Sequence, residues 1–226
     1  MQETLQVVTP PSTLPVTLEV CKVQCRVDAS ITTEDGYITS LIGVATEHAE
    51  KILKMSLVNR TYAWSFDYFP NRIVLANGLT IGSSWLNSRL YPYTQAQILY
   101  LPKPPLVSVT SVQYVDENGN TQTVADYQCP GVQNGPVIPG RIAPLPGQIW
   151  PATQDALGAI TVTYVAGFGF LEDGITPNVP QGIQYAIQAM VGELWINREV
   201  STDQTLNALP LSVTQLLNAN KYGFYT

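Results

Sequence analysis

This 226-residue sequence is poor in charge and has three cysteines and one histidine. Charged residues make up 12% of the chain, about half of the share usual in globular proteins. Its 11 basic residues form no run and the formal net charge is −6, which argues against a protein that coats nucleic acid. No stretch approaches the roughly 18 apolar residues of a membrane-spanning helix. Because Met1-Gln2-Glu3 also lacks the basic start of a signal peptide, we expect a soluble protein with no membrane role.

The few cysteines do not predict a disulfide framework or a metal site. Cys21, Cys25 and Cys129 are odd in number, and the first two are spaced to share one face of a helix. Zinc usually takes four ligands, and His48 is the single histidine available to join the pair. We interpret Cys21 and Cys25 as small apolar side chains packed in a helix, with reduced thiols that fit intracellular assembly. The sequence therefore predicts no metal and no cofactor.

No motif predicts a catalytic residue. Gly167 and Gly169 follow a predicted strand, but Glu172 stands where a phosphate-binding loop has its third glycine, and no helix begins there. A serine or cysteine triad would need His48, which falls on the exposed side of an amphipathic helix. The neighbouring acids at 116–117 and 172–173 lie in turn-like sequence. A hydrolase with carboxylates paired only in space stays open as an alternative, but the sequence favours a protein that is not an enzyme.

Two helices are predicted near the N-terminus. Thr17 is a suitable N-cap for a short helix over 18–26, and Thr32, three residues before Asp35, resembles a capping box that opens a helix over 34–55. The apolar residues of the second helix follow the i, i+3, i+4, i+7 pattern of one buried face: Ile38, Leu41, Ile42, Ala45, Ala49, Ile52 and Leu53. The opposite, exposed face is predicted to carry Glu47, Glu50, Lys51 and Lys54.

Two more helices are predicted near the C-terminus. Pro180 suits the first turn of a helix that runs to Glu199. Its buried stripe is predicted to consist of Ile183, Ala186, Ile187, Met190, Val191 and Leu194. Pro210 is expected to open a shorter helix that buries Val213, Leu216 and Leu217.

Between these helices the sequence has the two-residue period of strands. An aromatic face is predicted for the strand that contains Tyr62, Trp64, Phe66 and Tyr68. Further strands are predicted over 98–101, 107–115, 121–127 and 159–165. Asn118-Gly119 is a strong signal for a tight hairpin, and a slip in the alternation at Thr110-Ser111 indicates a bulge. Several short antiparallel strands joined by turns favour a small sandwich or barrel.

These patterns predict an α+β fold in which N- and C-terminal helices form a bundle that carries an inserted antiparallel β-rich, sandwich- or barrel-like module. The predicted parts are an extended N-terminal arm over 1–16, a helical bundle domain over 17–56 and 178–218, a β-rich module over 57–177, and a C-terminal tail over 219–226.

A long loop over 76–97 is unusual for its large apolar side chains. It carries Trp85, Leu90, Tyr91 and Tyr93, which is more apolar surface than a flexible linker has. Such a loop either contacts a partner or folds back over its own sheet, and the sequence favours neither. The aromatic residues also suggest an alternative function, a β-sandwich ligand- or carbohydrate-binding virion module, based on Tyr62, Trp64, Tyr68, Trp85 and Tyr93.

An ordered series of short motifs resembles a known family. They are Val16-Thr17-Leu18-Glu19, Arg26-Val27-Asp28, Leu101-Pro102-Lys103-Pro104-Pro105-Leu106, Val162-Thr163-Tyr164-Val165-Ala166-Gly167-Phe168-Gly169, Asn197-Arg198-Glu199 and Leu209-Pro210. Each motif alone is unspecific, but their order over about 16–69 and 98–217 is similar to that of tailed-phage head–tail connector proteins, also called head completion or adaptor proteins.

The resemblance implies a structural subunit of a ring, typically twelve-fold, that lies beneath the portal in the virion neck. Such a ring extends the DNA channel without sequence-specific DNA binding, docks stopper or tail proteins, and is assembled in the host cytoplasm. In this family a C-terminal segment commonly enters the portal, so the resemblance points to Lys221, Tyr222, Phe224 and Tyr225 as portal-binding residues. The loop over 76–97 is longer than the family pattern leads us to expect.

Overall fold

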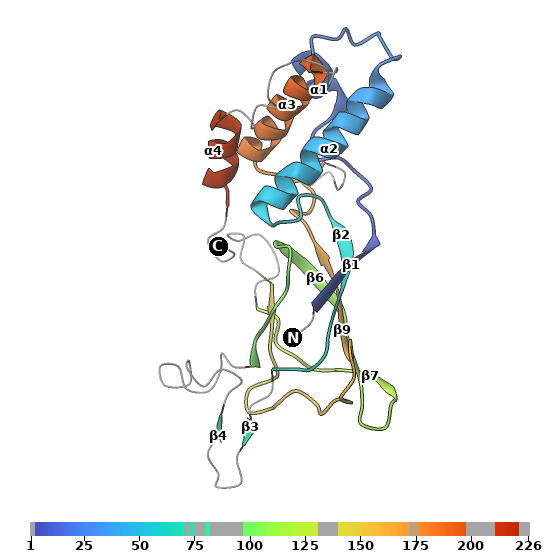
Figure 1. Ribbon diagram of the computed structural model, residues 1–226, viewed down its shortest axis with the longest axis vertical. Coiled ribbons are helices and arrows are strands. Elements are labelled where there is room, and N and C mark those ends of the chain that lie inside the picture. Colours follow the sequence, from blue (N-terminus) through green and yellow to red (C-terminus); the bar gives the residue numbers. More distant parts are fainter. Residues whose placement is uncertain are drawn as a thin grey trace. The chain divides into compact units, whose positions relative to one another are not determined.

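The computed structural model describes residues 3–70, 73–74, 80–81, 97–130, 140–171, 174, 176–197 and 211–221. It has an α+β fold that divides into two compact units (Figure 1). One unit, Met1–Pro10 with Arg60–Ala166, contains the strands and is called the β unit. The other, Pro11–Asn59 with Gly167–Thr226, contains the helices and is called the helical unit.

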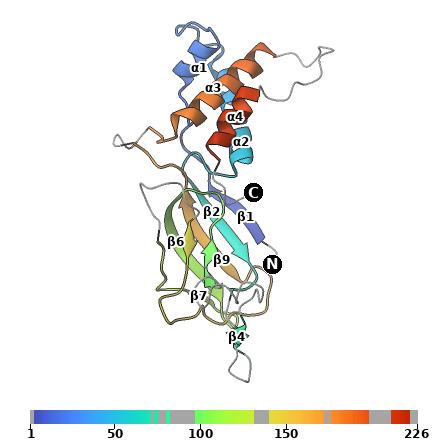
Figure 2. The ribbon, with the colours of Figure 1, turned by 90° about the vertical axis from the view of Figure 1, so that its left-hand side faces the viewer.

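The helical unit contains four helices from the two ends of the chain. They are α1 (Leu18–Gln24), α2 (Asp35–Leu53), α3 (Gln181–Ile196) and α4 (Leu211–Ala219). Helix α2 packs against each of the other three, and α3 packs against α1 and α4 (Figures 1 and 2). Helices from the two ends of the chain therefore pack against one another.

The helix starts confirm one predicted cap and correct another. The Thr17 hydroxyl accepts a hydrogen bond from the Val20 amide at 3.4 Å, so Thr17 is the N-cap of α1. Glu34 takes the N-cap position of α2 without a side-chain hydrogen bond, so the prediction of a capping box at Thr32 is wrong. The Thr32 carbonyl instead accepts from the Asp35 amide at 3.2 Å, which makes a backbone turn before the helix.

The core of the helical unit is aliphatic, and two predicted faces need correction. Ile38 and Ile42 of α2 and Ile187 of α3 are fully buried as predicted. Leu194, predicted to be buried, is 37% exposed because it lies in the last turn of α3. Glu50, predicted to be exposed, is 6% exposed, and its Oε1 accepts a hydrogen bond from the Leu57 amide at 2.9 Å.

The β unit is built on a five-stranded antiparallel sheet with the strand order β1-β2-β9-β6-β7 (Figure 2). These strands are β1 (Glu3–Thr9), β2 (Arg60–Phe66), β9 (Ile160–Ala166), β6 (Leu106–Val115) and β7 (Thr121–Thr123). Two short pairs accompany the sheet: β3 (Ile73–Val74) with β4 (Thr80–Ile81), and β5 (Leu99–Tyr100) with β8 (Arg141–Ile142). The predicted N-terminal arm is extended, but residues 3–9 pair with β2 rather than standing apart.

Local signals in the β region are largely confirmed. Gly119 has φ 83° in the hairpin between β6 and β7, where the Asp116 amide donates to the Asn120 carbonyl at 2.9 Å. The β6–β9 register shifts between Val109 and Ser111, at the predicted bulge. Strand β7 ends at Thr123, earlier than the predicted end at Tyr127.

The aromatic strand face forms the core of the β unit. Tyr62, Trp64 and Phe66 are buried, whereas Tyr68 lies beyond the end of β2 and is 51% exposed, so its predicted place on this face is wrong. Phe69 is buried instead and stacks on Trp150, with ring centroids 4.7 Å apart and an interplanar angle of 4°. Two of the aromatic residues behind the ligand-binding alternative, Tyr62 and Trp64, are therefore core residues.

Candidate partner-binding surfaces

The described residues offer little for metal or nucleophile chemistry. Among them, no group of three or more His, Cys, Asp or Glu side chains could hold a metal ion. Burial, and secondly the proximity of Cys25, raises the pKa of the Cys21 thiol to about 11. Burial also raises the pKa of the Cys129 thiol. Both thiols are therefore protonated near neutral pH, and a protonated thiol is a poor nucleophile.

Two aspartates with a shifted pKa serve loop structure. The Ser30 hydroxyl and amide donate to Asp28 and lower the pKa of its carboxyl. The pKa of Asp116 is also lowered, chiefly by the hydrogen bond from the Asn120 amide. General acids at neutral pH need a raised pKa, so these two carboxylates fit turns better than catalysis. The acids at 172–173 lie outside the described residues.

A groove of about 540 Å³ lies on the β unit, lined largely by residues 141–149. Prolines and aliphatic side chains dominate its wall, and Arg141 is the one charged residue among the described residues that line it. The described residues of its lining include no pair of titratable groups, which acid–base catalysis needs. No helix within the described ranges has both the length and the apolar character needed to cross a membrane.

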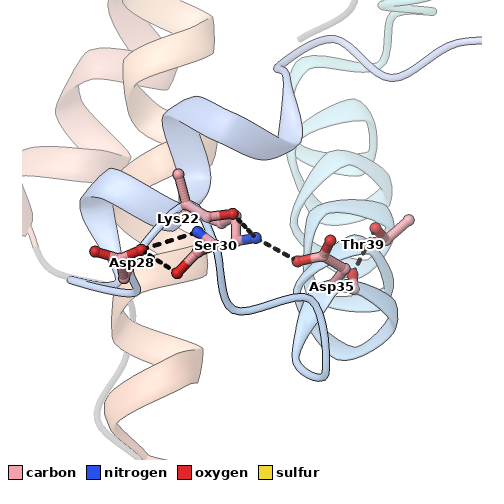
Figure 3. Close-up of polar contacts among 6 residues, drawn as sticks. Lys22, Asp28, Ser30, Asp35 and Thr39 are labelled. Carbon is pink, nitrogen blue, oxygen red and sulfur yellow. Dashed lines mark hydrogen bonds and ion pairs between the residues drawn. The ribbon is translucent and has the colours of Figure 1, made fainter.

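The connection between α1 and α2 is held by a buried lysine (Figure 3). The Lys22 side chain is 6% exposed, and its Nζ lies 2.6 Å from Asp35 Oδ1 and donates to the Ala29 carbonyl at 3.2 Å. Asp28 Oδ1 accepts from the Ser30 amide at 2.9 Å and from the Ser30 hydroxyl at 2.6 Å. A buried ammonium needs such partners, so these contacts fix the path of the connection.

Exposed apolar side chains surround this fixed connection. Val23 is 78% exposed on α1, and Val20 and Ile31 are each 43% exposed. A surface that is already ordered loses little conformational entropy on binding, which favours contact with a partner. We call Val20, Val23 and Ile31 the α1 apolar group.

A second apolar group lies where α2 begins and α3 ends. The Tyr37 ring packs on Trp195 with centroids 5.9 Å apart. Beside Trp195, Leu194 is 37% and Ile196 78% exposed, and Val44 lies two turns along α2 from Tyr37 at 54% exposed. The helical unit therefore has exposed apolar side chains both on and just after α1 and in the last turn of α3.

The residues predicted to bind partners lie almost entirely outside the described chain. Lys221 is half-buried after α4, and its amide donates to the Asn218 carbonyl at 3.1 Å. Tyr222, Phe224 and Tyr225, and the loop residues Trp85, Leu90, Tyr91 and Tyr93, lie outside the described residues. The portal- and loop-contact assignments therefore stay predictions.

Comparison with known proteins shows which solved structures have a similar fold. No protein-family profile matches the sequence, and no curated protein matches it. Solved structures do: a chain in the neck of an empty GTA particle computed with C6 symmetry aligns with TM-score 0.67 and 17% identity over 96% of this chain and 95% of that one. This chain shares its fold with that chain of the GTA neck. A chain in the virion of a native gene transfer agent (GTA) particle aligns with TM-score 0.63, and one in the native GTA neck computed with C12 symmetry with TM-score 0.61.

The last two alignments also have 17% identity and cover 96% of this chain and 94% of the other. At this identity the likeness concerns the fold. It agrees with the resemblance to head–tail connectors found in the sequence, because a connector is a neck protein.

Proposed function

We propose that this chain is a non-enzymatic structural protein of a virion neck, a head–tail adaptor whose copies form a ring beneath the portal. The observation that carries the proposal is the match to a GTA neck chain over 96% of the sequence with TM-score 0.67. In this proposal α1 to α4 close into a bundle that carries the β unit as an inserted module. The ring extends the DNA channel and docks stopper or tail proteins.

The distribution of charge supports a subunit through which DNA passes. The helical unit has eleven acidic and six basic residues, whereas the β unit has six acidic and five basic residues. Lys and Arg clusters bind phosphate, and an excess of carboxylates repels it. Acidic subunits around a channel would let DNA move without holding it, and low overall charge suits flanks that pack against neighbouring copies.

The neighbours' symmetry supports a ring, since the two GTA necks were computed with C6 and C12 symmetry. A closed ring needs two different surfaces on each subunit, one for each neighbour. We propose twelve copies per ring, located at the head–tail interface of the virion and assembled in the host cytoplasm.

The direct test is to mix the purified protein with its portal and measure complex masses by mass photometry, followed by electron cryo-microscopy of the particle neck. We expect a portal complex that gains one ring of twelve copies. A portal mutant truncated on its tail-side face is the matched control. A protein that stays monomeric with intact portal, and is absent from the neck map, would sink the proposal.

The C-terminal tail is proposed as the portal contact. Deleting residues 222–226 should weaken portal attachment by about tenfold or more and leave the circular dichroism melt unchanged, because an aromatic tail adds contact area without belonging to the described core. Deleting Thr226 alone is the control. Equal portal affinity of the two truncations would remove the tail from the interface.

A further inference from the structure

Strand β1 is an edge strand whose side chains are uncovered along its whole length. All seven residues, Glu3–Thr9, are exposed although the strand pairs with β2 from Glu3 to Val7 and, after a register shift, at Thr9. Leu5 lies opposite Trp64 and Val7 opposite Tyr62, so both share the face on which β2 buries its aromatic side chains. Leu5 and Val7 are nevertheless 36% and 46% exposed. The apolar face of the sheet therefore extends onto Leu5 and Val7, which the described residues of this chain leave partly uncovered.

This edge is protected from pairing only at its two ends. Natural edges are commonly short, or carry Lys, Pro, bulges or inward-pointing charges. In the seven-residue strand β1, Glu3 lies opposite Phe66 on the apolar face and the register shifts between Val7 and Thr9, but the stretch between these points has no charge, lysine or proline. Its outer backbone groups form a row of donors and acceptors that no described strand of this chain pairs with. Such a row, beside an apolar face, is chemically complementary to an extended segment of another chain.

The other edge of the same sheet is different in kind. Strand β7 has three residues, Thr121–Thr123, all polar and all exposed. Four successive antiparallel pairings separate β1 from β7, so the two edge strands point in the same direction. One sheet thus presents two unlike edges on opposite flanks. A head-to-tail ring needs this arrangement, because each copy meets its two neighbours through different surfaces.

We propose that the β1 edge is a subunit contact of the ring: the β7 flank of the next copy lies along it and covers Leu5 and Val7. This inference rests on the ring in the proposed function. Parallel pairing of β1 with β7 would remove both sheet edges, as closure does in other all-β assemblies.

The first test compares two double variants in ring assembly. Leu5→Lys with Val7→Lys places protective charges on the apolar face, where side chains this exposed can keep an ammonium in water. The control, Thr4→Lys with Gln6→Lys, places the same charges on the other face of the same strand. We expect the first variant to raise the protein concentration needed for half-assembly by about tenfold or more, and the control to shift it much less.

The second test keeps β1 apolar and reads the contact directly. In a Cys129→Ser background, Gln6→Cys and Thr123→Cys, which lie on the same face of the sheet, are combined in one chain and treated with a short bis-maleimide. We expect a ladder of covalent multimers from the double variant, and none from either single variant.

The outcomes separate this inference from the proposed function. If wild-type protein forms no ring with or without portal, the proposed function fails. If wild-type and Leu5→Lys, Val7→Lys protein assemble equally and the cross-link ladder is absent, the ring stands and the β1 contact is wrong. Loss of assembly by a double-lysine variant that is unfolded by circular dichroism leaves the decision to the cross-link, which either shows the β1–β7 contact or overturns it.

Discussion

The two units of this chain solve the problem of a stable core in different ways. Among the described residues, every buried Trp, Phe and Tyr lies in the β unit: Tyr62, Trp64, Phe66, Phe69, Trp150 and Tyr164. The buried polar and charged residues, Lys22, Thr46, Glu50 and Ser56, all lie in the helical unit. The β unit thus buries large rings, whereas the helical unit combines aliphatic side chains with buried polar groups.

The two kinds of buried residue contribute differently: large rings mainly stabilise the fold, whereas buried charges mainly fix the path of loops. Large rings remove much apolar surface from water per residue, so a small sheet can be stable with few of them. Buried charges add little net stability, because desolvation offsets their attraction, but they fix the path of the chain that they bind. Lys22 and Glu50 both hold connections: Lys22 the one between α1 and α2, and Glu50 the one after α2. We infer that the helical unit uses polar burial to place its loops.

The largest effect should come from removing a ring from the β unit. Trp150→Ala leaves a cavity beside Phe69 and removes the hydrogen bond from Trp150 Nε1 to the Gln97 carbonyl at 2.8 Å. We expect a loss of about 4 kcal/mol in the free energy of unfolding, measured by urea denaturation. Trp150→Phe keeps a stacked ring and should lose far less. Hydrogen exchange should quicken in β2 and β9 before α2 and α3, and equal quickening in both units would contradict separate cores.

The next effect concerns the point where the chain returns to the helical unit. Gly167 has φ 147°, and a Cβ there would lie 2.5 Å from the Asn59 amide nitrogen. Gly167→Ala should therefore cost about 2–4 kcal/mol. Gly158→Ala is the matched control, because Gly158 also has positive φ but open space around it, and should cost about 1 kcal/mol. Thermal melts of equal midpoint would show that close packing at Gly167 is unimportant.

The buried lysine should matter less for stability than for order. Lys22→Met removes the ion pair and leaves Asp35, whose side chain is 31% exposed, able to reach water. We expect a loss of about 1–2 kcal/mol, and faster amide exchange at Ala29 and Ser30. Adding Asp35→Asn should recover part of the stability. A large, uniform loss of protection across the helical unit would show that Lys22 supports the core itself.

The smallest effect tests how far the buried stripe of α3 extends. Leu194→Asp should change stability by less than about 1 kcal/mol, because Leu194 is 37% exposed. Ile187→Asp, at a fully buried position of the same helix, should unfold the helical unit. A similar collapse in both circular dichroism melts would show that Leu194 belongs to the core of the isolated chain.

Local patterns predicted most of the fold. The apolar period of α2, the Asn118-Gly119 turn and the bulge near Thr110 depend on neighbours within a few residues, and each is confirmed. The sequence missed what depends on distant partners. Glu50 falls on the charged face of α2 by spacing, yet the Leu57 amide in the following turn holds it in the core. Lys22 is likewise buried because Asp35 and Ala29 meet it there.

The surfaces proposed for binding were harder to predict than the fold. Val7 and Val8 within a polar N-terminal stretch were the signal for a strand, but its partner β2 lies fifty residues away in the sequence and no local rule connects them. Burial is also hard to predict at the ends of strands and helices. Just beyond β2, Tyr68 is exposed and the next residue, Phe69, is buried. Periodicity predicts the face on which a side chain lies. It does not predict where along that face the rest of the molecule ceases to bury the side chains.

Each unit is built from two separate stretches of the sequence, and this sets the order in which the units can fold during synthesis. All stretches of the β unit have left the ribosome once Ala166 has emerged, whereas α1 and α2 must wait for α3 and α4, which come later in the sequence. Until then the aliphatic faces of α1 and α2 have no helical partner. A nascent chain can therefore complete its sheet before its helical unit, because the apolar faces of α1 and α2 gain their helical partners only after α3 and α4 have been translated.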